Sequence, residues 1–293
     1  MKASDFLYHR PATVGEAAAL LADYCGGARI LAGGQSLLPM LNMRLVRPAS
    51  LIDICDLDAL KCVTAEGDTT VVGAMVRYRR IEDDPLIAER LPALPYMLHW
   101  VADRQVRNRG TLGGSLVQAD PTGEMPLAAL VLDAWLRITG NRGERSLRVE
   151  EFLLGSYATA LAPDEILVEI VYPRHPQHFS FFEVNRRHND FAVVSVLAVG
   201  NCDDDGTWSD LRIGLGGVDD TPVIARQAMQ RLDDGSLSEA AIVAAAEAAA
   251  QEINPGSDIR GSEEYRRHLT KVYVMRALCS LKERGAVRKR EAS

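Results

Sequence analysis

The stretch ILAGGQSLLPMLNMRLVRP, residues 30–48, decides how the first part of the chain folds. The apolar run 28–32 predicts a short strand, and a glycine pair ends it. A second apolar run, 37–45, follows the pair, and Pro48 closes it. The turn that joins the two runs consists of Ala32, Gly33, Gly34, Gln35 and Ser36.

A second stretch, QVRNRGTLGGSLVQADPTGEMP at residues 105–126, repeats this arrangement. Paired glycines lack Cβ atoms, so the backbone can approach a ligand closely and adopt positive φ. Successive N–H groups of such a turn form an anion nest, a following helix adds positive potential, and hydroxyls add donors. Two such loops in one domain predict a site that holds a diphosphate from both sides. The second loop consists of Thr111, Leu112, Gly113, Gly114 and Ser115.

Other interpretations of these loops stay open at the level of sequence. Neither loop is a Walker A or a GxGxxG sequence, and a lone Gly-Gly pair is often only a structural turn. Ser36 and Ser115 do not lie in a GxSxG elbow, so we expect hydrogen-bond donors and not nucleophiles. Arg107 and Arg109, just before the second loop, have three interpretations: they steer a diphosphate, dock a partner subunit, or form a solvated face.

Helix and strand signals alternate in the first 173 residues. Thr13, with Glu16 three residues later, predicts a capped helix over 13–24. Residues 104–115 are expected to form a loop. Further helices are predicted over 91–101 and 126–131, and further strands over 50–54, 70–73, 134–139 and 166–172.

The chain changes character after the polar, proline-bounded segment 173–178. Three strand-like runs separated by short polar turns predict an antiparallel meander of three strands, followed by helices. The strands are expected over 179–185, 191–200 and 211–216, and the helices over 222–232, 238–253 and 265–284. The predicted class is therefore α+β.

The composition excludes several classes of protein. The chain has 293 residues, 25% of them charged, with a formal net charge of −7. An acidic chain is a poor candidate for tracking nucleic-acid phosphates. We see no signal peptide and no apolar run of about 20 residues, so we expect a cytoplasmic protein without a membrane span.

Cysteine and histidine patterns give no sign of a metal site in this chain. The five cysteines are widely spaced and include no CxxC, so we expect buried or half-buried free thiols in a reducing cytosol. The six histidines show no metal-ligand spacing beyond His175-x-x-His178, which lies in the polar segment. We therefore predict no disulfide, zinc or iron–sulfur site here.

Four stretches in this order carry a resemblance to a known family: residues 30–48 and 105–126, then EILVEIVYP at 165–173 and FFEVNRRHNDFAVV at 181–194. They resemble the FAD-binding medium subunit of carbon monoxide dehydrogenase, the flavin domain of xanthine dehydrogenase, and nicotine and caffeine dehydrogenases. The resemblance implies a two-subdomain FAD-binding domain of the vanillyl-alcohol-oxidase (PCMH-like) type over 1–175. It also implies a small C-terminal domain over 179–285, and we expect residues 286–293 to be a flexible tail.

The resemblance assigns residues to FAD one by one. The first loop, with Leu31 before it, matches the loop around the pyrophosphate, and Thr111, Gly113, Gly114 and Ser115 match the loop on its ribityl side. The remaining matches are single positions: Leu37 beside the isoalloxazine ring, Val101 at the adenosine end, Leu167 in contact with the cofactor, and Phe191 over the flavin ring.

Two acidic positions depart from the family pattern. Glu124 stands where an acidic residue, often Asp, contacts the cofactor's hydroxyls. Glu183 stands where xanthine-dehydrogenase-like members carry Lys. A lysine would stabilise a reduced, anionic flavin and a glutamate would oppose it, which leaves open an electron acceptor other than NAD.

The resemblance implies an oxidoreductase subunit that transfers electrons through FAD. Two 2Fe–2S clusters on a small partner would deliver electrons from a molybdopterin cofactor on a large partner, and the assembly would be a dimer of heterotrimers. No catalytic residue is expected in this chain. Two alternatives remain at this point: a self-sufficient flavin oxidase of the vanillyl-alcohol-oxidase type, and a non-enzymatic nucleotide-binding assembly module.

Overall fold

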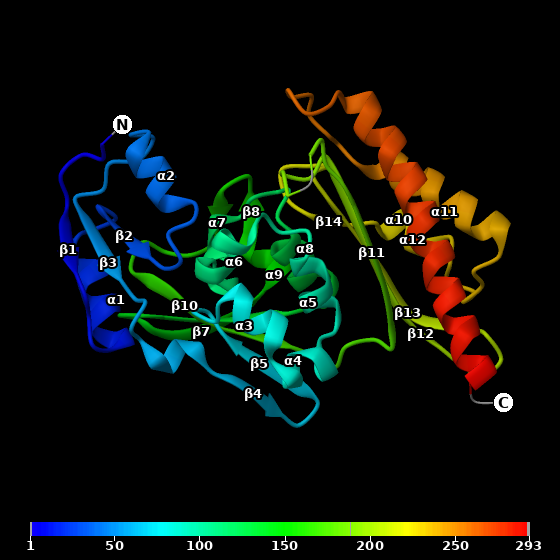
Figure 1. The fold of residues 1–293 in the computed structure, drawn as a ribbon, viewed down its shortest axis with the longest axis horizontal. Helices are drawn as coiled ribbons and strands as arrows, with labels where there is room; N and C mark the ends of the chain where they lie inside the picture. Colours follow the sequence, from blue (N-terminus) through cyan, green and yellow to red (C-terminus); the bar gives the residue numbers. More distant parts are fainter. Residues whose placement is uncertain (1, 188, 292–293) are drawn as a thin grey trace. The chain divides into compact units, whose positions relative to one another are not determined.

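The computed structural model describes residues 2–187 and 189–291, with side chains as far as residue 285. It has a mixed α/β fold made of two compact units (Figure 1). The first unit comprises Met1–Leu91, Asp103–Ala119 and Ala134–Pro173. The second unit comprises Pro92–Ala102, Asp120–Asp133 and Arg174–Ser293. Each unit therefore draws on separate parts of the chain.

A small parallel sheet opens the first unit. Its strands lie in the order β1 (Leu7–His9), β3 (Ser50–Asp53) and β2 (Ala28–Leu31). Helix α1 (Val14–Asp23) starts as predicted, because Thr13 Oγ1 accepts the N–H of Glu16 at 3.1 Å. Its buried residues pack with those of β2 and β3 in one apolar cluster: Ala17, Ala18, Leu21, Ala28 and Ile52. The first glycine loop leaves this sheet at the end of β2 and enters α2 (Leu37–Asn42).

An antiparallel sheet of five strands completes the first unit. Its strands follow the order β4 (Val63–Glu66), β5 (Thr69–Gly73), β10 (Glu165–Tyr172), β6 (Trp135–Gly140) and β7 (Gly143–Arg148). The pairing of β10 with β6 shifts between Leu167 and Glu169, which marks a bulge. The connecting elements of this unit are η1 (Asp58–Lys61), α3 (Tyr78–Asp83), α4 (Pro85–Arg90), α6 (Arg104–Arg109), α7 (Leu112–Gln118), α9 (Val149–Phe152), β8 (Leu153–Gly155) and β9 (Ala158–Thr159).

The expectation of a loop over 104–115 is wrong, because two short helices occupy it. Asp103 caps α6 by accepting the N–H of Val106 at 3.0 Å. Thr111 caps α7 by accepting the N–H of Gly114 at 3.2 Å. Each cap replaces a hydrogen bond that the first turn of a helix lacks, and the glycine pair therefore enters a helix.

The second unit contains an antiparallel sheet. The three predicted strands are present as β11 (His178–Val184), β12 (Val194–Cys202) and β13 (Trp208–Gly216), paired in that order. The expected count of three is wrong, because the two-residue strand β14 (Val223–Ile224) pairs with β13. A strand of two residues is too short to show an alternating pattern, and the expectation over 222–232 was a helix beginning at Pro222.

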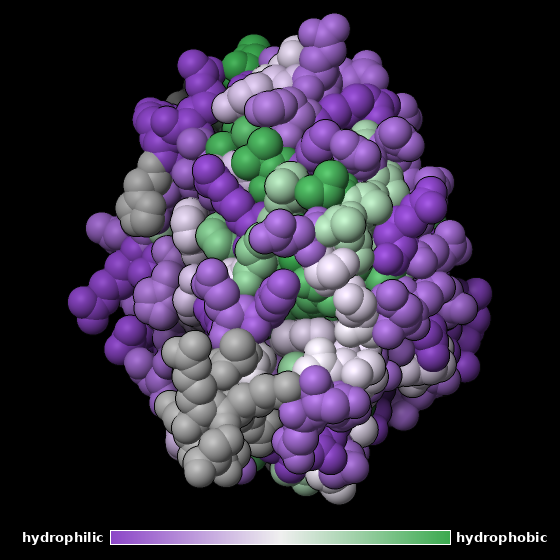
Figure 2. All heavy atoms as spheres, turned by 90° about the vertical axis from the view of Figure 1, so that its right-hand side faces the viewer, coloured by the Kyte–Doolittle hydropathy of each residue, from purple (hydrophilic) through white to green (hydrophobic). Residues whose placement is uncertain are grey.

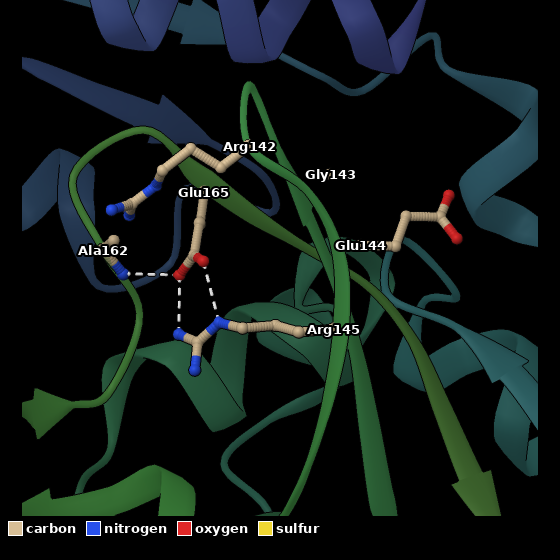
Figure 3. A pocket seen from close by; sticks show the side chains of 6 residues that line it. All are labelled: Arg142, Gly143, Glu144, Arg145, Ala162 and Glu165. Carbon is tan, nitrogen blue, oxygen red and sulfur yellow. Dashed lines mark hydrogen bonds and ion pairs between the residues drawn. The ribbon is translucent and has the colours of Figure 1, made fainter.

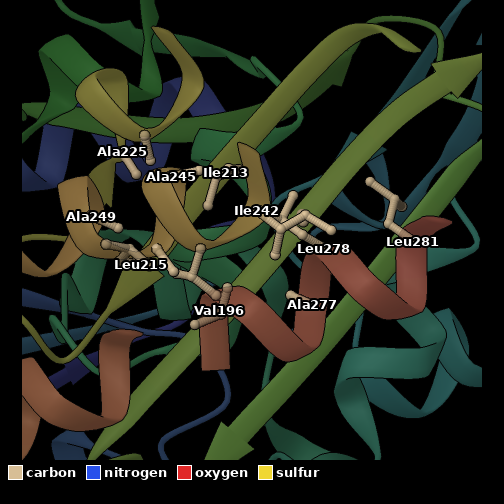
Figure 4. Packing of buried hydrophobic residues seen from close by; sticks show 14 of the residues in the cluster. Val196, Ile213, Leu215, Ala225, Ile242, Ala245, Ala249, Ala277, Leu278 and Leu281 are labelled. Carbon is tan, nitrogen blue, oxygen red and sulfur yellow. The ribbon is translucent and has the colours of Figure 1, made fainter. Parts of the chain in front are cut away.

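Helices cover both faces of this sheet. On one face α10 (Arg226–Gln230), α11 (Glu239–Glu252) and α12 (Glu263–Glu291) cover Val196, Ile213 and Leu215 (Figure 4). On the other, α5 (Ala93–Leu98) and α8 (Glu124–Val131) pack against β11, β12 and β13. Figure 2 shows the outer side of α11 and α12, where apolar side chains gather and polar ones border them.

The C-terminal segment that was expected as a tail, residues 286–293, is helical as far as it is described. Helix α12 runs on to Glu291, and residues 292–293 lie outside the described part of the chain.

The cysteines differ from expectation in their exposure. Cys55 and Cys202 are half-buried, but Cys25, Cys62 and Cys279 are exposed, so the expectation of buried or half-buried thiols is wrong for these three. Among the described residues, no helix is long and apolar enough to cross a membrane.

Candidate functional site

The two glycine loops lie side by side in the first unit. A Cβ atom on Gly33 would stand 2.3 Å from the carbonyl oxygen of Arg109 and 3.0 Å from Cα of Gly110. A Cβ atom on Gly114 would stand 3.7 Å from Cβ of Ala32. Segments nearly 80 residues apart therefore touch, and only glycine leaves room for this approach.

The first loop has the properties of an anion nest. Gly34 has a φ of +74°, a conformation that favours glycine. Within the described chain, the N–H groups of residues 33–36 donate to no protein acceptor. The hydroxyl of Ser36 stands in front of α2 without capping it. This loop therefore presents several unused donors, which fit an anionic group.

The second loop is not an anion nest, which corrects the expectation. The N–H of Leu112 donates to Val76 O at 3.0 Å, and that of Gly113 donates to Ala74 O at 2.9 Å. The N–H of Gly114 donates to its own cap, Thr111. Neither glycine of this pair has positive φ. The protein itself uses these donors, and the half-buried Ser115 contributes a hydroxyl from the first turn of α7.

Cys55 supports the first loop, and sequence reasoning missed it. Its Sγ donates to Ala32 O at 3.1 Å. Burial, with a smaller effect from hydrogen bonding to Asp53, raises the pKa of the Cys55 thiol to about 11, so the donor persists at neutral pH. Asp53 in turn accepts the hydroxyl of Tyr8 and the N–H of Cys55. The sequence signal that could have found Cys55 was its position. It follows β3 at the carboxyl end of the parallel strands, where β2 also ends.

The predicted apolar residues of the first unit frame the loops. Leu31 ends β2, and its Cδ1 lies 3.4 Å from the Cβ position of Gly34. Leu37 begins α2 and is half-buried. Leu167 is buried in β10, one residue before Val168, whose carbonyl accepts the N–H of Ala74 beneath the second loop.

The other predicted residues belong to the second unit: Val101, Glu124, Glu183 and Phe191. Val101 is buried. The ring of Phe191 is 55% exposed, and the guanidinium of Arg260 lies 5.0 Å from its centroid. Asp190 accepts the N–H of Phe191 at 2.9 Å and pairs with Arg187, so its carboxylate holds the turn before Phe191.

Glu183 belongs to a polar row on the α8 side of the second sheet. It lies opposite Ser195 of β12, which lies opposite Gly216 of β13. Glu183 Oε1 accepts Nδ2 of Asn185 at 3.1 Å. Its Oε2 and the hydroxyl of Ser195 are buried without a hydrogen-bond partner in the described structure.

Burial raises the pKa of two carboxyls here, Glu183 of this row and Glu124 of α8. Burial first, and then the charge of Glu124, raise the pKa of Glu183 to about 9. Burial also raises the pKa of Glu124 to about 7, and Asp120 adds to the effect. Burial therefore favours the neutral form of Glu183. A neutral carboxyl opposes an anionic flavin less than a carboxylate does, and the effect of Glu183 on the flavin stays a prediction.

A hollow of about 300 Å³ lies elsewhere in the first unit, at the turn between β6 and β7 (Figure 3). Within it, Arg145 forms a two-pronged pair with Glu165, at 2.7 and 2.8 Å. Two of the charges that line the hollow, Arg145 and Glu165, thus satisfy each other, and no predicted cofactor residue lines it. Its lining residues are Arg142, Gly143, Glu144, Arg145, Ala162 and Glu165.

Family comparisons agree with the geometry of the loops. The family described as "FAD binding domain in molybdopterin dehydrogenase" matches residues 3–175, which include both loops. This chain is a member of that family. The family described as "CO dehydrogenase flavoprotein C-terminal domain" matches residues 179–281 of the same chain. As a family member, the chain is a subunit of an oxidoreductase with an FAD-binding domain.

Individual relatives of this FAD-binding chain match it over nearly its whole length. The alpha subunit of the 6-hydroxypseudooxynicotine dehydrogenase complex of Paenarthrobacter nicotinovorans is 36% identical, over 97% of both chains. The carbon monoxide dehydrogenase medium chain of Hydrogenophaga pseudoflava is 36% identical, over 93% of this chain and 96% of its own.

Solved structures show the same fold. A chain of the carbon monoxide dehydrogenase from Hydrogenophaga pseudoflava superimposes with a TM-score of 0.93 at 35% identity, covering 97% of this chain and 99% of its own. A chain of quinoline 2-oxidoreductase from Pseudomonas putida 86 gives the same TM-score at 38% identity, with the same coverage.

Proposed function

We propose that this chain binds one FAD non-covalently, with the diphosphate at the paired glycine loops. The observation that carries the proposal is the contact between the loops, where Gly33 approaches Arg109–Gly110 and the N–H groups of residues 33–36 are unused. A negatively charged group is the natural acceptor for such donors. Membership of the FAD-binding family supports this choice of dinucleotide.

The proposal keeps the residues that the sequence singled out, with Gly113 and Gly114 placing the second loop beside the diphosphate and not donating to it. The first loop, Ser115 and the cap Thr111 contact the diphosphate and ribityl chain, and Leu31, Leu37 and Leu167 provide apolar contacts. By the family resemblance we assign Val101 to the adenosine end, Glu124 to the cofactor's hydroxyls, and Glu183 and Phe191 to the flavin ring. We keep residues 1–175 as the FAD-binding domain and 179–285 as the C-terminal domain of this proposal.

The proposed activity is electron transfer within a larger cytoplasmic complex. A large partner with a molybdopterin cofactor oxidises the substrate, and a small partner with two 2Fe–2S clusters delivers the electrons to this chain. The chain passes them to an external acceptor. The FAD supplies the redox chemistry when bound, while this chain binds and orients it. Relatives named as a medium chain or as a complex subunit support a multi-subunit assembly. We propose a dimer of heterotrimers for this assembly.

Reconstitution of the full-length chain tests the proposal. The purified chain is incubated with FAD, separated from free FAD, and assayed for flavin absorbance and flavin content. We expect one FAD per chain, released on unfolding because the bond is non-covalent. A colourless chain after this treatment would contradict the proposal. Turnover of an organic substrate by the chain alone would instead support a self-sufficient oxidase.

Co-purification tests the partners. Tagged chain, expressed with the reading frames that flank its gene, should bring down a small iron–sulfur protein and a large molybdenum protein. Metal and flavin analysis of the complex should give iron, molybdenum and FAD together. Recovery of the chain as a pure homo-oligomer with FAD would support cofactor binding and contradict the proposed assembly.

A further inference from the structure

Two exposed arginines, Arg77 and Arg109, flank the paired glycine loops. In the described structure neither guanidinium has a hydrogen-bond or ion-pair partner. Their neighbours differ in this respect. Arg107 is held by Glu82 at 2.8 Å, and Arg79 pairs with Asp83 at 2.9 Å. Of the three interpretations open for the arginines before the second loop, a solvated face thus does not apply to Arg107, which is half-buried and pairs with Glu82.

Arg77 is fixed beside the second loop by backbone pairing. It forms an antiparallel bridge with Thr111. On one side of the bridge Leu112 donates to Val76 O at 3.0 Å, and on the other Tyr78 donates to Gly110 O at 2.9 Å. Arg77 and Thr111 are therefore a non-hydrogen-bonded pair, in which the two side chains leave the backbone on the same side and lie close together. Arg77 thus extends alongside the threonine that caps α7.

Arg109 is fixed beside the first loop. Its carbonyl oxygen lies 2.3 Å from where a Cβ of Gly33 would be, so its backbone is in direct contact with the first loop. Arg109 is also the last residue of α6, two positions before Thr111. The two arginines therefore approach the loops from different elements, α6 and the start of α3.

The positive charges of Arg77 and Arg109 both act on the same side chain, the thiol of Cys55. Each of them lowers the pKa of the Cys55 thiol, against the larger effect of burial. The sulfur of Cys55 donates to Ala32 O in the first loop. Both guanidiniums therefore lie within electrostatic reach of the backbone at which the two loops meet.

A diphosphate bound here requires positive charge that the loops do not supply. The first loop offers neutral N–H donors. In the second loop three N–H groups already donate hydrogen bonds to Val76, Ala74 and Thr111. A doubly charged diphosphate is held more firmly by guanidinium groups, which bind phosphate oxygens in a charge-assisted way. We propose that Arg77 and Arg109 supply this charge and hold the diphosphate of the dinucleotide. This inference rests on the proposed function.

Paired substitutions with two flavins test the inference. The variants are Arg77→Gln, Arg109→Gln and both together, and Arg79→Gln removes one nearby positive charge as the matched control. Flavin fluorescence gives Kd for FAD and for riboflavin, which lacks phosphate. All three side chains, Arg77, Arg79 and Arg109, are exposed, so we expect the variants to fold, and circular dichroism checks this.

We expect each single variant at Arg77 or Arg109 to weaken FAD binding about fivefold at low salt, and the double variant about 25-fold. The losses should shrink at high salt, because salt screens exposed charges. Riboflavin affinity and the Arg79→Gln control should stay near wild type. Unchanged FAD affinity in the double variant, or an equal loss for riboflavin or for Arg79→Gln, would overturn the inference. A wild-type chain that binds no FAD would refute the proposed function itself, which is a separate result.

Discussion

The two glycine loops share a sequence pattern, but glycine serves a different purpose in each. In the first loop Gly34 adopts positive φ and the N–H groups are left unused. In the second loop the pair belongs to the first turn of α7, where Gly113 lets the helix lie directly on Ala74. The comparison teaches that a Gly-Gly pair indicates close approach, while the acceptors around it decide whether it binds an anion.

The largest expected effect comes from Gly113. A Cβ atom here would stand 2.5 Å from Cβ and 2.8 Å from Cα and O of Ala74. Because backbone cannot move aside easily, Gly113→Ala should lower the free energy of unfolding of the cofactor-free chain by about 3 kcal/mol. Chemical denaturation measures this. Gly155→Ala, where a Cβ meets nothing within 4 Å, is the matched control. Equal stability of Gly113→Ala and Gly155→Ala would contradict the view that the second glycine pair serves the packing of α7 on Ala74.

Gly33→Ala should affect binding more than folding. Its Cβ would push against the carbonyl of Arg109, so the loops must separate at the surface where the ligand is proposed to lie. We expect a loss of about 2 kcal/mol in FAD binding, or about thirtyfold in Kd. The check is a titration with FAD beside a denaturation curve of the same variant. A fall in stability as large as that of Gly113→Ala, with binding intact, would reverse the comparison.

Thr111 and Ser36, the hydroxyl residues that precede α7 and α2, should differ in how much they stabilise the cofactor-free chain. Thr111 caps α7, so Thr111→Val should lower the free energy of unfolding by about 1 kcal/mol. Ser36 makes no cap bond to α2, so Ser36→Ala should leave the cofactor-free chain unchanged. Thermal unfolding of both variants without FAD tests the pair. A comparable loss in Ser36→Ala would mean that the first loop is built like the second.

The smallest effect concerns the thiol under the first loop. The pKa of Cys55 is raised from 9.0 to about 11, so any stability that this thiol contributes is present below pH 9 and is lost as pH rises toward 11. At pH 9 only about one in a hundred Cys55 side chains should be a thiolate. Alkylation at pH 9, followed by mass spectrometry, should therefore modify the exposed Cys25 and Cys62 well before Cys55. Prompt modification of Cys55 would show that the bond to Ala32 is not maintained.

Local patterns predicted many elements of this fold. The helix after Thr13 and the strands near residues 28–31, 50–53 and 165–172 lie within a residue or two of expectation. The loop expected over 104–115 was wrong because two side-chain caps, from Asp103 and Thr111, outweigh the loop preference of glycine. The parallel pairing of β1 with β3 depends on contacts between distant residues, which periodicity cannot reveal.

The candidate site was predictable as a set of residues but not as an arrangement. The glycine pairs mark where backbone approaches closely, so both loops could be found. Their contact, the use of the Gly113 N–H by Ala74, and the role of Arg77 all depend on tertiary pairing. The protonation of Glu183 depends on burial beneath α8, and a sequence gives only the residue type.

The raised pKa of Glu183 has a consequence for any comparison with a lysine at this position. Replacing a lysine by an ionised glutamate would change the local charge by two, but a protonated glutamate changes it by only one. A carboxylic acid also keeps one O–H donor, which a lysine supplies as N–H. With Oε2 lacking any partner in the described structure, the position retains a hydrogen to donate while giving up a permanent cation.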